Sequence, residues 1–112
     1  MLSEDRIRLQ HILDEAKEAL SFIEGYLFND FIKDNKTVHA VMRCIEIIGE
    51  AAAKLTKEYK EEHSSVPWNQ IVGMRNHLIH VYFDVDHKTL WKTLQEDIPE
   101  LIEITMKLLN KE

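Results

Sequence analysis

The sequence predicts an all-α fold, arranged as an up-and-down bundle of four helices, and two observations lead to this prediction. Apolar side chains recur at three- and four-residue spacing over long stretches, which is the period of an amphipathic helix. The 112 residues contain only 3 glycines and 2 prolines, too few for the many tight turns of an all-β domain. A chain of this length is expected to form one domain, which we place at residues 1–112.

The first predicted helix begins at Ser3, a residue type that caps helix N-termini. Glu4 and Asp5 follow in its first turn, where the helix dipole favours acids. Apolar side chains then recur at helical spacing along its whole length: Ile7, Ile12, Leu13, Ala16, Leu20, Ile23 and Leu27. The polar residues 29–36 are expected to break or bend the chain after it.

The second predicted helix runs from about Thr37 to about Lys60, and the three alanines at 51–53 give another helix room to approach it. The segment Ser-Ser-Val-Pro at 64–67 marks the start of a third helix, because proline is favoured in the first turn. This third helix is predicted over Trp68–Tyr82.

The fourth predicted helix follows a turn at residues 84–87 and extends from about His87 to Leu109, with Asp86 as its N-cap. Pro99 interrupts it, because proline has no N–H to give to the preceding turn. We therefore expect a kink near Gln95 or the start of a new segment there.

Charge and cysteine content limit the classes of protein that fit. The net charge is −6, from 14 basic and 20 acidic residues, which argues against a nucleic-acid binder because phosphate contacts need cations. The single cysteine, Cys44, can form neither an internal disulfide nor a Cys-based zinc site, which favours a reducing compartment. No apolar run approaches the roughly 18–20 residues of a membrane span, and the acidic start does not resemble a signal peptide. We expect a cytoplasmic protein with no membrane partner.

The distribution of charge qualifies the argument from net charge. No Asp or Glu occurs between Glu62 and Asp84, although acids make up 20 of the 112 residues. This acid-free window contains one arginine and three histidines: His63, Arg75, His77 and His80. It fits a buried helix that excludes carboxylates and equally an anion-binding surface, and the two can hold for different faces of one helix.

Within this window lie the residues best suited to chemistry. At 100° per residue, four polar side chains share one side of the predicted third helix: Arg75, Asn76, His80 and Tyr82. Histidine transfers protons near neutral pH, and the arginine fork neutralises charge that develops on a phosphate. Together they favour phosphoryl transfer without a metal. The alternative is that they are ordinary ion-pair and hydrogen-bond partners.

Other candidate sites carry less chemistry. Glu46 and Glu50 lie one turn apart and can pair with Arg43 or Lys54 on their own helix, or with Arg75. Cys44 in mid-helix is expected to be buried filler rather than a nucleophile. The Glu-x-x-His spacing of di-metal bundles and the glycine loop of nucleotide-binding sites do not occur, so we expect no metal and no cofactor.

The segment Arg75-x4-His80-x-Tyr82 matches the R-x4-H-x-Y signature of the HepT-like toxins, members of the HEPN superfamily of RNA-associated helical domains. The similarity extends along the chain in three further stretches: RCIEIIGEA at 43–51, VPW with IVGMRN at 66–76, and LW with DIPEL at 90–101. The sequence thus resembles this family over nearly its whole length.

The resemblance implies a homodimeric helical bundle in which the arginine and histidine of both protomers line a cleft. It implies a metal-independent ribonuclease toxin that acts on mRNA or tRNA and not on DNA, with Arg75 and His80 catalytic and Asn76 supporting them. It also implies an MntA-like nucleotidyltransferase antitoxin that transfers AMP to Tyr82, giving an O-AMP-tyrosine. The alternative function is a non-catalytic HEPN module that only binds such a nucleotidyltransferase, and the acidic net charge favours it.

Overall fold

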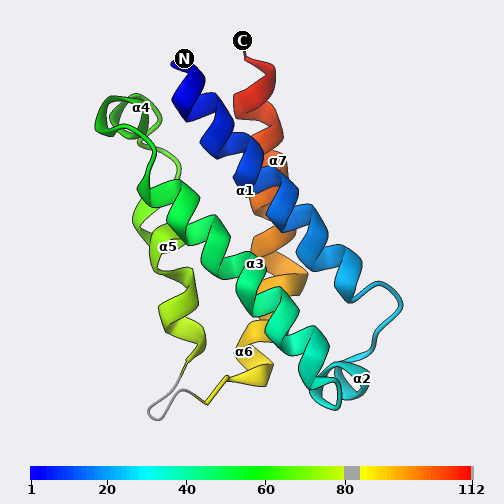
Figure 1. Ribbon diagram of the computed structural model, residues 1–112. Coiled ribbons are helices and arrows are strands. Elements are labelled where there is room, and N and C mark those ends of the chain that lie inside the picture. The colour runs from blue at the N-terminus through cyan, green and yellow to red at the C-terminus, as the bar shows by residue number, and fades with distance from the viewer. Residues whose placement is uncertain (80–83, 112) are drawn as a thin grey trace.

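The computed structural model describes residues 1–79 and 84–111, and these residues form an all-helical bundle (Figure 1). The predicted fold class is confirmed, but the helices of the described part are shorter than predicted and more numerous. They are, in chain order, α1 (Ser3–Phe22), α2 (Phe28–Ile32), α3 (Asn35–Ala53), α4 (Lys57–Glu62), α5 (Trp68–Gly73), the 3-10 helix η1 (Met74–Leu78), α6 (His87–Lys92), the π-helical segment η3 (Thr93–Asp97) and α7 (Ile98–Asn110). None of the helices in the described residues is both long and apolar enough to cross a bilayer.

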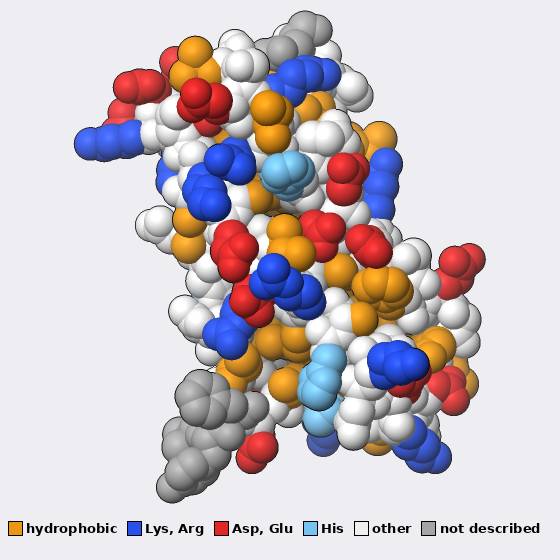
Figure 2. Space-filling view, in the orientation of Figure 1, with side chains coloured by type: hydrophobic (Ala, Val, Ile, Leu, Met, Phe, Trp, Pro, Cys, Tyr) orange, Lys and Arg blue, Asp and Glu red, His pale blue; other side chains and the backbone are white. Residues whose placement is uncertain are grey.

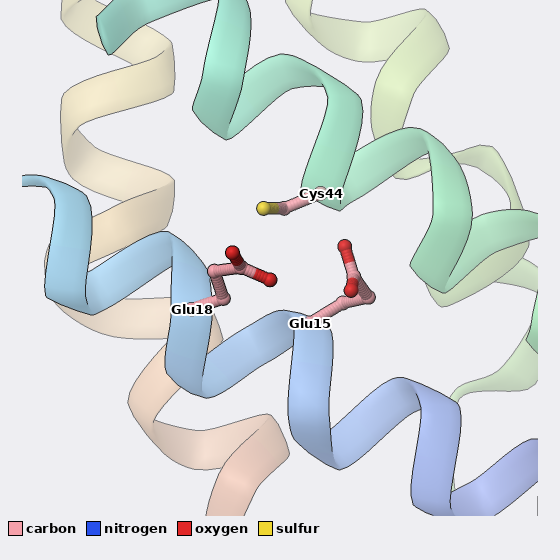
Figure 3. A group of neighbouring side chains, drawn as sticks. All are labelled: Glu15, Glu18 and Cys44. Atoms are coloured by element: carbon pink, nitrogen blue, oxygen red, sulfur yellow. The ribbon is translucent and has the colours of Figure 1, made fainter.

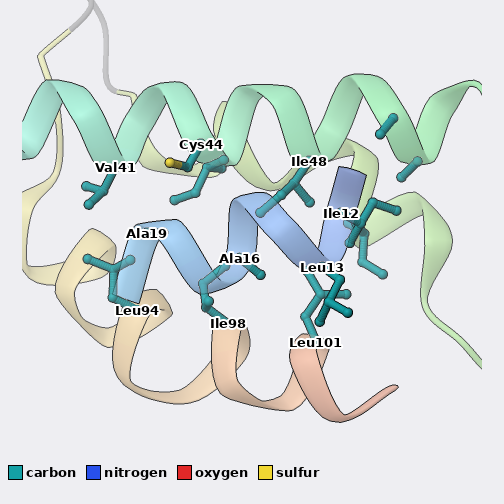
Figure 4. Close-up of a cluster of buried hydrophobic side chains, with 14 of the residues drawn as sticks. Ile12, Leu13, Ala16, Ala19, Val41, Cys44, Ile48, Leu94, Ile98 and Leu101 are labelled. Atoms are coloured by element: carbon teal, nitrogen blue, oxygen red, sulfur yellow. The ribbon is translucent and has the colours of Figure 1, made fainter. Parts of the chain in front are cut away.

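The core lies where α1 packs between α3 and the segment formed by η3 and α7 (Figure 4). Small side chains on α1 allow this close packing, since Ala16 and Ala19 are fully buried. They face branched residues of the two neighbouring elements: Val41 and Ile48 of α3, Leu94 of η3, and Ile98 and Leu101 of α7. Most of the apolar stripe predicted for the first helix is buried here, but Ile7 and Leu27 are 51% and 73% exposed.

The start of α1 differs from the prediction by one residue, and Asp5 has an additional role. The N-cap is Leu2, and Ser3 is already helical. Asp5 is only 2% exposed, and its carboxylate accepts hydrogen bonds from the backbone N–H of Thr56 (2.8 Å) and from the Thr56 hydroxyl (2.7 Å). The acid therefore ties α1 to the connection between α3 and α4, in addition to lying at a helix N-terminus.

The second predicted helix is wrong beyond residue 53. α3 ends at Ala53, and a separate helix, α4, begins after Thr56, whose hydroxyl caps it by accepting from the Tyr59 N–H. The start of α3 is set by Asp34, whose carboxylate accepts from the Thr37 N–H (3.1 Å) and hydroxyl (2.6 Å). The N-cap at Thr56 thus divides the segment that the periodicity alone joined.

The third predicted helix is wrong beyond residue 73. α5 ends at Gly73, η1 continues to Leu78, and Ile79 is extended and forms an isolated antiparallel bridge with Val85. The projection at 100° per residue therefore does not hold across the signature segment, because a 3-10 helix advances about 120° per residue. Residues 80–83 lie outside the described residues.

The fourth predicted helix is confirmed at its start, where the Asp86 carboxylate accepts from the Thr89 N–H and hydroxyl. α6, η3 and α7 follow one another without a break. Pro99 lies in the first turn of α7, directly after the π-helical segment. A new helical segment thus begins beside the proline; the kink angle stays a prediction.

Candidate functional site

The candidate site is built where α5 and η1 lie against α3, and Gly49 of α3 makes this contact close. A Cβ placed on Gly49 would lie 3.0 Å from the carbonyl oxygen of Val72 and 3.8 Å from that of Ile71. Because both neighbours are backbone atoms, a larger residue at 49 would push α5 away. The glycine thus sets how near η1, which continues α5, comes to α3.

η1 presents Arg75 to α3. Leu78, one 3-10 turn further along, is 1% exposed and fixes η1 on the core. The Nε of Arg75 lies 3.6 Å from Oε2 of Glu46, and the arginine side chain remains 41% exposed. Of the pairings that the sequence left open for Glu46, the structure selects Arg75 and also Arg43.

Four charged residues form what we call the α3 cluster: Arg43, Glu46, Glu50 and Arg75. The Nη1 of Arg43 lies 3.1 Å from Oε1 of Glu46 and 3.9 Å from Oε1 of Glu50. Each oxygen of the Glu46 carboxylate therefore faces a different arginine. Figure 2 shows basic and acidic side chains interspersed over the face that α3 presents.

The structure places only part of the predicted catalytic set. Asn76 is exposed on η1 next to Arg75, and so is His77. His80 and Tyr82 belong to residues 80–83, which lie outside the described residues, so the described site contains neither side chain. The site as described is a partly exposed arginine that pairs with Glu46 on a buried anchor, immediately before the segment that carries the histidine and tyrosine of the signature.

Sequence reasoning did not identify a groove on the side of η1 that faces α6 and α7. It has a volume of about 460 Å³ and is lined by apolar residues that include Ile71, Met74 and Leu101, with His77 and Asp97 among its polar residues. Its parts come from segments about thirty residues apart in the chain, so only the packing of η1 on the bundle reveals it.

A second cluster links α1 and α3 (Figure 3). The carboxylates of Glu15 and Glu18 and the thiol of Cys44 point toward one another, with all three ligand atoms within 4.8 Å. Burial, and then the charges of the two glutamates, raise the pKa of the Cys44 thiol from 9.0 to about 12. The prediction that Cys44 is buried is confirmed, and a thiol with this pKa is protonated at neutral pH and is not a nucleophile.

Comparison with known proteins agrees with this architecture. Residues 12–108 match the model of the HepT-like family, described as ribonuclease HepT-like. This match covers most of the chain, so the chain belongs to the HepT-like family of the HEPN superfamily.

Curated relatives extend the match to nearly full length. A protein of Caldanaerobacter subterraneus subsp. tengcongensis named "Putative RNase" is 45% identical over 104 residues, 93% of each chain. A "Probable ribonuclease HepT" of Thermococcus cleftensis is 45% identical over 93 residues, covering 80% of this chain and 84% of its own. A "Putative RNase" of Methanocaldococcus jannaschii is 40% identical over 93 residues, covering 83% and 85%. No solved structure matches the chain.

Proposed function

We propose that this chain is the toxin of a prokaryotic toxin–antitoxin system, a metal-independent endoribonuclease that is silenced by AMPylation of Tyr82. The observation that carries the proposal is the position of Arg75, held half-exposed beside α3 at the start of the Arg75-x4-His80-x-Tyr82 signature. Membership of a ribonuclease family supports the reaction class, and a guanidinium at the surface supplies the charge that this reaction needs.

In the proposed reaction the RNA supplies its own nucleophile. The 2′-hydroxyl attacks the adjacent phosphorus and loses its proton to a base, while the bond to the 5′-oxygen breaks and that oxygen gains a proton. The products are a 2′,3′-cyclic phosphate and a 5′-hydroxyl. His80 transfers protons as base or acid, Arg75 stabilises the negative charge on the phosphorane, and Asn76 orients the substrate or His80. No step requires a metal.

A homodimer is part of the proposal, because it brings the arginine and histidine of two protomers to one cleft. A chain of 13.2 kDa also has a limited core of its own, which favours association. Light scattering at micromolar concentration should give twice the monomer mass. A stable monomer would remove the shared cleft from the mechanism.

The catalytic assignment is tested with three variants of the purified protein on mRNA and tRNA substrates. His80→Ala should reduce cleavage at least about 100-fold, the usual contribution of a general acid or base. Arg75→Lys should also fail, because a point charge does not replace the planar fork. His11→Ala, an exposed histidine on α1, is the control and should cleave normally. Cleavage by wild type should survive EDTA, and undiminished cleavage by His80→Ala would refute the assignment.

Regulation by AMPylation draws support from the other two tyrosines. The hydroxyl of Tyr26 donates to Oδ2 of Asp34 at 2.6 Å, and Tyr59 is 5% exposed. Neither offers a free phenol to an enzyme, which supports Tyr82, the acceptor that the family resemblance implies. Incubation with the MntA-like nucleotidyltransferase and ATP·Mg²⁺ should add adenylate to wild type but not to Tyr82→Phe. Peptide mapping that places the adenylate on Tyr26 or Tyr59 would contradict the proposal.

The second candidate function is a non-catalytic module that binds the nucleotidyltransferase, and the net charge of −6 favours it. The two functions differ in what the isolated chain does. A purified toxin cleaves RNA and arrests growth when expressed alone, whereas a binding module does neither and still forms the complex.

A further inference from the structure

We propose that Arg43 is a second phosphate-binding residue, so that the backbone of a single-stranded RNA substrate crosses α3 between Arg43 and Arg75. This inference rests on the ribonuclease function proposed above and extends its site from η1 onto α3. It assigns a role to a residue that lies outside the signature segment.

The geometry brings the two guanidiniums together through one carboxylate. Arg43 lies 3.1 Å from Oε1 of Glu46, and Arg75 lies 3.6 Å from Oε2 of the same side chain. Because a carboxylate is only two C–O bonds wide, the two contacting nitrogens are at most about 9 Å apart. The chain has four arginines, and two of them thus meet at one point of the surface.

The direction of the Arg43 side chain also points to this site. Besides Glu46, it contacts Glu50, seven residues further along the same face of α3, so the side chain runs toward the C-terminal half of that helix. That half contains Gly49, where the backbone of α5 lies close to α3. The guanidinium of Arg43 is therefore directed to the part of α3 that η1 reaches.

The carboxylate between the arginines can be exchanged for a phosphate. The side chains of Arg43, Glu46 and Arg75 are 60%, 39% and 41% exposed, and ion pairs in this environment contribute little to stability. A phosphodiester offers two oxygens in place of the two carboxylate oxygens, and the arginine fork binds either group bidentately. Glu46 thus lies between both arginines before the RNA binds, and a phosphate can displace it.

The acid-free window explains why the balancing carboxylate belongs to α3. Residues 63–83 contain no Asp or Glu, so η1 has no acid of its own to neutralise Arg75. Glu46 supplies one from across the helix contact and shares it with Arg43. Phosphates that approach along η1 meet no carboxylate from this segment before they reach the two arginines.

The test compares RNA binding and cleavage by wild type, Arg43→Ala and Arg43→Lys, with a single-stranded RNA labelled for fluorescence anisotropy. For Arg43→Ala we expect Kd and KM to rise about tenfold, as for the loss of one hydrogen bond to a charged group, with kcat within twofold of wild type. The slope of log Kd against log salt should become shallower by about 0.7, the value for one phosphate contact on a single strand. Arg43→Lys should restore most of the affinity, since a point charge still binds a phosphate.

Arg8→Ala is the matched control, because it removes the same charge from α1. Arg8 lies near the start of that helix, where Asp5 bonds Thr56 beyond the end of α3, and its variant should bind and cleave like wild type. If Arg43→Ala behaves like Arg8→Ala, or if it loses kcat with KM unchanged, Arg43 does not bind substrate phosphate. If wild type neither binds nor cleaves RNA, the ribonuclease proposal fails first and this inference fails with it.

Discussion

The contact between α5 and α3 at Gly49 leads to a sharp prediction about Gly49→Ala. A methyl group at this position would lie 3.0 Å from the Val72 carbonyl oxygen, whereas ordinary contacts begin at 3.4 Å. The backbone of α5 therefore has to move by a few tenths of an ångström. Because η1, which carries Arg75, directly continues α5, the distance from Arg75 to Glu46 should increase with that movement.

The size of the effect follows from two opposing contributions. Overpacking of a well-packed contact costs about 1–3 kcal/mol. Alanine recovers up to about 1 kcal/mol over glycine through helix propensity. Gly73→Ala has only the second contribution, because a Cβ at Gly73 would meet only Nε2 of His77, at 3.9 Å. The difference in stability between the two variants therefore isolates the overpacking. We expect Gly49→Ala to be less stable than Gly73→Ala by about 1–3 kcal/mol, or about 4 °C in Tm for each kcal/mol.

Urea unfolding and RNA cleavage measured on the same preparations provide the assay. Gly49→Ala should lose stability and also several-fold in kcat, because it displaces the proposed phosphate-stabilising arginine. Gly73→Ala should be as stable as wild type or slightly more stable, with normal cleavage. Equal stability of the two variants would refute the reasoning, since it would mean that α5 does not contact α3 at Gly49.

Three further predictions concern other parts of the bundle. Asp5→Ala should destabilise the chain by about 1.5–3 kcal/mol, measured by urea unfolding, because it leaves the N–H and hydroxyl of Thr56 without their acceptor. Hydrogen bonds from Thr37 and then Tyr26 lower the pKa of Asp34 from 3.8 to about 2. The contribution of Asp34 to stability is therefore complete above pH 4 and disappears as the pH falls toward 2. Asp34→Asn should flatten this part of the plot of unfolding free energy against pH, and an unchanged plot would contradict the assignment. Cys44, with its pKa raised to about 12, should react with iodoacetamide at pH 7.5 only after denaturation, and rapid labelling of the native protein in a mass spectrum would show that it is accessible.

Periodicity predicted the fold class because burial on one side of a helix leaves a repeating trace in the sequence. Ile12, Leu13, Ala16 and Ile23 belong to the apolar stripe predicted for the first helix, and all four are buried. The pattern continues across helix ends, however, since residues after a cap still pack on the same core. Leu55 is buried although α3 has already ended at Ala53, which is why the second helix was predicted too long.

The change of helix type at Met74 could not be predicted from the apolar pattern. Leu78 is buried in the 3-10 helix just as it would be in an α-helix, so its burial does not distinguish the two. The Arg75–Glu46 pairing was among the alternatives from sequence, but choosing it requires knowing that α5 crosses α3 at Gly49. Which acid an arginine meets depends on the crossing of two helices, and neither sequence segment contains that information alone.

Net charge is a weak guide to RNA binding in a chain of this kind, because charge acts over short distances in salt. At physiological ionic strength the Debye length is about 8 Å, so acids elsewhere on the bundle hardly influence a phosphate at the α3 cluster. The charge that such a phosphate meets is set by the two arginines and by the two carboxylates beside them, Glu46 and Glu50. An overall charge of −6 and a local phosphate site are therefore compatible, provided that the phosphate displaces the exposed carboxylate between the arginines rather than adding to it. The same balance would keep non-specific attraction to nucleic acid low, since only a strand that reaches both arginines gains from the exchange.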